Sequence, residues 1–244
     1  VEKINLNAQY PHIQLLGSAL CQQAGLLVSR SRLVHVHLNG ADTAVAGYPM
    51  YGTYAHNDVV DGDFADYHNL GPVNIYRTIR TGSMEADFTY LGEDSEPYRQ
   101  VYFKETNAAE DDWRDLIQLC QLLTETPDET FAASVEESLD VDNWLRFFAI
   151  NTFFDNRETG LSNGIGDDFI HFKDLTGNRH VLVPYDLDTI LGRGDTPGSP
   201  TAGLFQAAEP ANASGHMTQP DPLARLLQPP ALLPRHFARP ADRP

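Results

Sequence analysis

Hydrophobic and polar residues alternate along several segments of the first hundred residues, and a period of two predicts β-strands. These segments are residues 1–7, 31–38, 43–51, 73–82 and 97–107. Asn39-Gly40, between the second and third of them, is the dipeptide most typical of a tight hairpin turn. Residues 13–24 instead carry apolar side chains at helical spacing, and Pro11 suits the first turn of such a helix. The pattern therefore predicts a β-rich region that contains one helix.

After residue 107 the apolar positions recur at helical spacing, which predicts three helices. Residues 111–126 open with acidic side chains, which favour a helix N-terminus, and a second helical run follows from Phe131. Residues 141–156 form a third, strongly apolar helix, for which Asp140 or Asp142 is the expected cap. The residues after Gly194 are rich in Pro, Gly and Ala, so we expect loop there apart from one short helix within residues 222–237.

A second hairpin is predicted near the end of the helical part, with an acid at each outer end. Residues 168–172 alternate, a turn follows, and residues 180–184 return, so antiparallel pairing brings Asp168 close to Asp186. Two such carboxylates repel each other unless they share a proton or a cation. Oxygen ligands of this kind favour Mg²⁺, Mn²⁺ or Ca²⁺ over zinc. Glu158 lies ten residues before Asp168, in a loop from which it could act on a substrate hydroxyl.

The same acids would also serve as caps of helices and turns, and the residues alone do not choose between that role and a metal site. Asp155, Asp167 and Asp188 share this position at the ends of elements. His35 and His37 point to one side of a strand, but no third ligand is evident nearby, so an exposed strand face is expected. We likewise expect the acidic, glycine-broken residues 58–68 to form a solvated loop rather than a calcium site.

Composition narrows the classes of partner. The 244 residues include 17 Lys and Arg against 34 Asp and Glu, a net charge of −17, which repels nucleic acid and anionic membranes. No apolar run approaches the length of a membrane span, so neither nucleic acid nor a membrane span is expected. Cys21 and Cys120 both lie in apolar helical contexts, which predicts two buried free thiols.

Several segments resemble, in order, the landmarks of the spore-coat-protein-H (CotH-type) atypical protein kinases. The segments are KINLN, VHVHLNG and the glycine-led strand after it, NIYRTI, YFKETN with DDW, AINTFFDN, VPYDLDTILG and PLARLLQPP. The most specific is VPYDLDTILG, in which Tyr185 stands where the family usually has Trp. The resemblance extends over most of the chain.

This resemblance implies an α+β, two-lobed, atypical protein-kinase-like fold. Residues 1–107 would form a β-rich N-lobe, residues 108–195 a mostly helical C-lobe with the metal-site hairpin, and residues 196–244 a Pro/Gly-rich, incomplete end of the C-lobe. The implied reaction moves the γ-phosphate of ATP to Ser or Thr of a protein substrate, such as a coat or surface protein, with Mg²⁺ or Mn²⁺. In such chemistry the protein mainly positions groups and neutralises charge.

The resemblance also implies roles for single residues. Asp186 matches the metal-binding Asp, and Asp168 matches the second metal ligand, where the family usually has Asn. Glu158 stands where the family usually has its catalytic Asp. Arg77, where many members have Lys, and Lys104 would be the cations that bind the phosphates of ATP.

These departures leave alternatives open. Glu158 is one methylene longer than Asp, and Arg is not equivalent to Lys, so the chain is either an active variant or a catalytically impaired binding or structural protein of a surface or coat. A glycosidase that uses Glu158 and Asp186 is a third hypothesis, but the basic strands nearby favour phosphate over sugar. Members of the family commonly act outside the cytoplasm, so an extracellular or cell-envelope location is expected. The sequence predicts no oligomeric state.

Overall fold

The computed structural model contains both helices and sheets, and it describes residues 3–44, 52–79, 81, 84, 86–156, 158–159, 168–194 and 224–227. Its strands are β1 (Asn5–Asn7), β2 (Ser31–His35), β3 (His37–Leu38), β4 (Ala41–Asp42), β5 (Thr53–Asn57), β6 (Val73–Thr78), β7 (Tyr102–Lys104), β8 (Phe169–Asp174) and β9 (His180–Pro184). Its helices are α1 (Pro11–Gln23), α2 (Gly62–Tyr67), α3 (Glu96–Arg99), α4 (Arg114–Glu125), α5 (Asp128–Ser138), α6 (Val141–Phe154) and α7 (Ala224–Leu227), with a 3-10 turn η1 (Ala108–Glu110). The predicted α+β class is confirmed, whereas the two-lobed arrangement stays a prediction.

The first strands form a three-stranded sheet in the order β1-β5-β2, and β3 and β4 form a separate hairpin. Asn39 and Gly40 connect β3 to β4 with positive φ angles of 52° and 82°, as a type I′ turn requires, so the predicted hairpin is confirmed. Its described return strand is only Ala41–Asp42, and residues 45–51 of the predicted strand lie outside the described residues. The next described strand, β5, pairs with β1 and β2.

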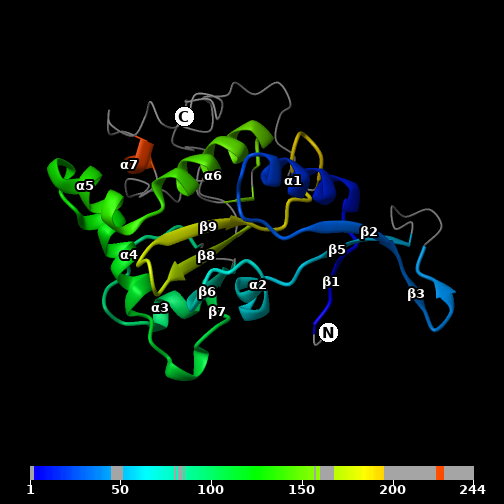
Figure 1. Ribbon diagram of the computed structural model, residues 1–244, viewed down its shortest axis with the longest axis horizontal. Coiled ribbons are helices and arrows are strands. Elements are labelled where there is room, and N and C mark those ends of the chain that lie inside the picture. The colour runs from blue at the N-terminus through cyan, green and yellow to red at the C-terminus, as the bar shows by residue number, and fades with distance from the viewer. Residues whose placement is uncertain are drawn as a thin grey trace.

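A four-stranded antiparallel sheet in the order β7-β6-β8-β9 occupies the middle of the molecule (Figure 1). The predicted hairpin of residues 168–184 is confirmed, since Phe169 of β8 pairs with Pro184 of β9. Strand β6 pairs with β8 from Val73, opposite Asp174, to Arg77, opposite Ile170. The sheet therefore joins strands from both sides of residue 107, and the division into residues 1–107, 108–195 and 196–244 stays a prediction.

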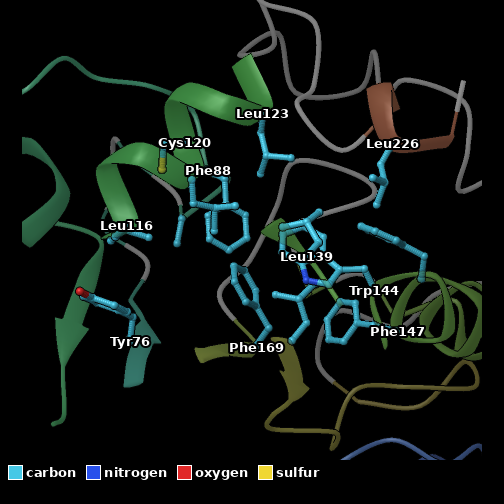
Figure 2. Packing of buried hydrophobic residues seen from close by; sticks show 14 of the residues in the cluster. Tyr76, Phe88, Leu116, Cys120, Leu123, Leu139, Trp144, Phe147, Phe169 and Leu226 are labelled. Carbon is cyan, nitrogen blue, oxygen red and sulfur yellow. The ribbon is translucent and has the colours of Figure 1, made fainter. Parts of the chain in front are cut away.

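Each face of this sheet packs against its own hydrophobic cluster. On one face Phe169 points toward Phe88, at 5.4 Å between ring centres, and Trp144 and Phe147 of α6 complete the packing (Figure 2). On the other face Val73, Ile75, Phe172 and Val183 pack against Val60 and Phe64, the latter from α2. Helices α6 and α2 accordingly lie on opposite sides of β8 and β9 in Figure 1.

Several local predictions can be compared with the structure. The Asp140 side chain accepts a hydrogen bond from the Asn143 backbone N–H and so caps α6. Cys21 and Cys120 are buried free thiols, as predicted. The prediction of loop for residues 58–68 was wrong in part, because Asp61 caps the short helix α2. Residues 97–107 contain the helical turn α3 before the short strand β7. No helix among the described residues is long and apolar enough to cross a membrane.

Candidate functional site

Two carboxylates converge in the turn that follows β9. The Asn7 side-chain N–H₂ donates to Asp186 Oδ1 at 2.8 Å and to Asp188 Oδ2 at 3.0 Å, so both acids lie against one amide nitrogen of β1. Asp186 adopts the left-handed conformation with φ of 46°, which Asp tolerates better than most residues. Leu187 and Ile190 of the same turn are fully buried in the hydrophobic core and so fix the position of the two acids.

Helix α1 holds this turn in place. A Cβ atom added to Gly17 would lie 2.7 Å from Leu187 Cβ and 2.9 Å from Ile190 Cδ1. Real Cβ atoms do not approach other carbons this closely, so only glycine lets the helix pack directly on the turn. The acidic turn is therefore fixed by β9 on one side and by α1 on the other.

Asp188 is only 6% exposed, and its surroundings disfavour the ionised form. Burial and the negative charge of Asp186 raise the pKa of Asp188 to about 7, with a smaller contribution from Glu158 in the same direction. The hydrogen bonds from Asn7 and Thr189 act against these effects by lowering the pKa. A carboxylate in this position is stabilised by a proton or by a cation that it shares with Asp186.

The end of α6 positions Glu158 and Asp168 beside this pair through a series of amide side chains. Asn151 Nδ2 donates to the Phe147 carbonyl at 2.9 Å, and Asn156 Nδ2 donates to Asn151 Oδ1 at 3.0 Å. Asn156 Oδ1 in turn accepts from the Glu158 backbone N–H at 3.0 Å.

The backbones of Glu158, Asp168 and Tyr185 are then linked directly. The Asp168 N–H donates to the Glu158 carbonyl at 3.0 Å, and the Tyr185 N–H donates to the Asp168 carbonyl at 3.3 Å. Glu158 and Asp168 are each 9% exposed. Both residues thus lie at the same end of the β8–β9 hairpin as the acid pair.

Arg77 reaches the same region from β6. Burial raises the pKa of the Tyr185 phenol, as do the charges of Asp186 and Asp168, whereas the charge of Arg77 lowers it. The phenol therefore lies close enough to Asp186, Asp168 and Arg77 for their charges to change its pKa. The Arg77 guanidinium is half exposed and lies 3.3 Å from Glu105 Oε1. It remains accessible to an anion.

Lys104 lies on the opposite face of the sheet, away from these residues. Strand β7 alternates buried Tyr102, exposed Phe103 and buried Lys104, so the lysine faces the helices. Its ammonium donates to the Tyr76 hydroxyl at 3.1 Å and to the Asp112 carbonyl. The structure thus brings Glu158, Asp168, Asp186 and Arg77 to one end of the hairpin and keeps Lys104 apart from them.

A cavity of about 350 Å³ opens beside the acid pair. Its lining is mostly polar: Asn5, Asn7, Gln9, Gln14, Ser29, Asn57, Tyr185, Asp186 and Asp188, together with Leu6, Ala8, Val28 and Pro184. The volume lies in the range of small-molecule sites. The combination of two carboxylates with several amides in its lining makes it a candidate ligand site.

A family model described as CotH kinase protein matches residues 2–239. The chain belongs to the CotH kinase family. No curated protein matches the chain. Membership of the CotH family makes this a kinase-like protein and suggests the use of ATP and a divalent metal. Asp186 and Asp188 are candidate ligands for such a metal.

For this CotH-family chain, sequence patterns identified the hairpin acids but not the residues that gather around them. Asn7, Gln14 and Asn57 were missed, and Asp188 was recognised only as an acid at the end of an element. The signal in β1 was the spacing of Asn5 and Asn7 in KINLN, which places two amides on one side of a strand. Nothing in the sequence indicated that this side would face a turn 179 residues away.

A cation at this site would be held by few protein ligands. Among the described residues, no group of three or more His, Cys, Asp or Glu side chains is arranged to hold a metal ion. Mg²⁺, however, is commonly bound by one or two carboxylates together with water and substrate phosphates. The neighbouring carboxyls of Asp186 and Asp188 supply such a donor set and fit a cation that a nucleotide brings with it.

Proposed function

We propose that this protein is a metal-dependent phosphotransferase that moves the γ-phosphate of ATP to Ser or Thr of a protein. The observation that carries the proposal is the convergence of Asp186 and Asp188 on Asn7 beside a polar cavity of about 350 Å³. A buried carboxylate beside a second, partly exposed one is unfavourable unless a cation neutralises them, and phosphoryl transfer from ATP requires such a cation. Membership of the CotH kinase family supports the same reaction.

In this proposal Asp186 and Asp188 hold the divalent cation, water and the ATP phosphates complete its coordination, and Asp168, the second ligand predicted from the sequence, lies at the same end of the hairpin. When bound between these residues and ATP, Mg²⁺ or Mn²⁺ would neutralise part of the negative charge of the phosphates. Asn7 fixes the two carboxylates through its paired hydrogen bonds. Arg77, already balanced by Glu105 in the protein alone, binds the phosphates of ATP from β6.

Glu158 is the proposed base for the acceptor hydroxyl. Its backbone is held by hydrogen bonds with Asn156 and Asp168, and Asn151 in turn holds Asn156. Its negative charge helps to raise the pKa of Asp188. The side chain is one methylene longer than Asp, so the acceptor hydroxyl would lie about one carbon–carbon bond farther from the backbone than in relatives with Asp. If no acceptor hydroxyl comes within hydrogen-bond distance of Glu158, the protein binds ATP without transferring phosphate. This binding is the alternative function.

The experiment that tests the proposal measures transfer of labelled γ-phosphate to a generic acceptor protein and to the chain itself, with Mg²⁺, Mn²⁺ or Ca²⁺. We expect transfer with Mg²⁺ or Mn²⁺, and a loss of at least about 100-fold in Asp186→Asn. Asp174→Asn, at the opposite end of β8, is the matched control and should keep full activity. Equal transfer by the wild-type and Asp186→Asn proteins would contradict the proposal, and binding of metal–ATP without transfer would favour the alternative function.

A further inference from the structure

Two amide side chains on the cavity wall each have a carbonyl oxygen with no hydrogen-bond partner among the described residues. Gln14 of α1 is 3% exposed and Asn57 of β5 is 6% exposed. Within the part of the chain that the structure describes, Gln14 Oε1 and Asn57 Oδ1 are buried and accept no hydrogen bond. Both residues line the cavity that also contains Asp186 and Asp188.

Unsatisfied buried acceptors are rare in folded proteins because each loses its hydrogen bonds to water without replacement. Here the two residues belong to different elements and open on the same space. Packing alone would be served better by apolar side chains of similar size. The arrangement therefore indicates a ligand that presents hydrogen-bond donors to this wall.

We infer that Gln14 and Asn57 determine the nucleoside specificity of the site, an inference that rests on the proposed phosphotransferase function. In ATP at neutral pH, the hydrogen-bond donors are the 6-amino group of adenine and the ribose hydroxyls, whereas the phosphates only accept. The carbonyl oxygens of the two amides complement the nucleoside, and the acidic turn with its cation complements the phosphates. The lining of this one cavity thus contains groups that match both halves of the same molecule.

Both amides are carried by rigid elements, as recognition requires. Asn57 lies in β5, the central strand of its sheet, opposite Asn5 of β1 and Ser31 of β2. Gln14 lies on α1 one turn before Gly17, the point of direct contact between this helix and the acidic turn. The amides and the acids are therefore held in fixed relation to each other before any ligand enters.

The test compares binding of two probes by calorimetry in the presence of Mn²⁺: ATP, and inorganic tripolyphosphate, which has no nucleoside. The variants are Gln14→Met and Asn57→Leu, which replace the amides with apolar groups of similar size. Gln23→Met, at an exposed position of the same helix, is the matched control. We expect each cavity variant to bind ATP about tenfold more weakly, the effect of one lost hydrogen bond, and to bind tripolyphosphate as the wild type does.

Thermal unfolding without ligand gives a second readout. Because the variants remove an unsatisfied buried amide, their melting temperatures should equal or exceed that of the wild type, which a merely structural role for the amides would not produce. Should Gln14→Met fold poorly, Gln14→Asn withdraws the carbonyl by one methylene and should weaken ATP binding in the same way.

Three results would overturn the inference, and they differ from failure of the proposed function. Unchanged ATP affinity in both variants, or an equal loss for both probes, removes the specificity role. A wild-type protein that binds tripolyphosphate as tightly as ATP also removes it, while leaving metal-dependent phosphate binding intact. A wild-type protein that binds neither probe removes the proposed function and the inference together.

Discussion

Two polar clusters lie beside the central sheet, and they differ in whether protein groups satisfy their hydrogen-bonding atoms. On the helix-facing side, Asp115 accepts from the Tyr76 hydroxyl at 2.5 Å and from Asn74 Nδ2 at 2.8 Å, and Lys104 donates to the same Tyr76 hydroxyl. Each of these groups is satisfied by another protein group. We call this set the internal network.

The cluster at the end of β9 is built differently. Asp186 and Asp188 share one amide nitrogen, and Gln14 and Asn57 leave acceptors unsatisfied on the cavity wall. Like charges and unpaired acceptors are costly in a protein alone, but a metal-bound nucleotide offers a partner to both. Complete internal pairing is therefore typical of a structural cluster, whereas incomplete pairing around a cavity indicates a ligand site.

The largest expected contrast is between the two cations that were predicted to bind ATP. Lys104→Met should lower the free energy of unfolding by about 3 kcal/mol, because it leaves the Tyr76 hydroxyl and the Asp112 carbonyl without the charged donor that both accept from. Arg77→Met should change stability by less than about 1 kcal/mol, since the guanidinium is half exposed and its pair with Glu105 contributes little. Urea unfolding measures both.

The same two variants sharpen the assignment of function. Phosphate transfer should fall in Arg77→Met, whereas folded Lys104→Met at low temperature should keep its affinity for metal–ATP. A Lys104→Met protein that is fully stable but unable to bind ATP would show that this lysine belongs to the site after all.

The same chemical change in each cluster should have opposite signs. Asp115→Asn should destabilise the protein by about 2 kcal/mol, because a charged acceptor of several hydrogen bonds is lost. Asp188→Asn should stabilise it by about 1 to 2 kcal/mol in the presence of a chelator, because it removes a buried like charge beside Asp186. Denaturation curves at pH 8 compare the two variants directly, and destabilisation by Asp188→Asn would contradict the ligand-site interpretation.

The last prediction concerns His171, which stacks on Tyr76 of the internal network, and its neighbour His180. The Lys173 ammonium can only donate, so His180 Nε2 accepts and His180 Nδ1 donates to His171 Nε2 at 2.8 Å. This pairing requires His171 to be neutral, and burial lowers its pKa to about 3.

Because the folded-state pKa of His171 lies below the ordinary value, its contribution to stability is fully present above pH 6.5. It is lost as pH falls toward 3, by about 1.4 kcal/mol per pH unit. His171→Gln can accept the same hydrogen bond without titrating, so its free energy of unfolding should fall less steeply between pH 6.5 and 5. Parallel pH profiles for the two proteins would show that His171 is protonated in the fold.

Local patterns predicted much of the fold. The turn at Asn39-Gly40, the cap at Asp140 and the β8–β9 hairpin follow from turn chemistry, capping and alternation, all of which act over a few residues. The pairing of β6 with β8 spans more than ninety residues, and alternation specifies the face of a strand but not its neighbour.

The same limit applies to the candidate site. The acids were predicted because the hairpin brings its own two ends together. The orientation of Lys104 depends on which face of β7 packs against the helices. The alternation in YFKETN is compatible with either face, so the sequence does not predict the orientation. The roles of Gln14 and Asn57 depend on a cavity, and the segments that enclose it are far apart in the sequence.

The hydrogen bonds of Asn7 have a consequence for how the protein is made. Asn7 and Asp186 are 179 residues apart in sequence, and translation proceeds at about 5–20 residues per second, so roughly ten to forty seconds separate their synthesis. During that interval strand β1 has no acidic turn to bind. The cavity can therefore close only after nearly the whole described chain has been synthesised, and we expect ligand binding to report completed folding rather than to assist its first steps.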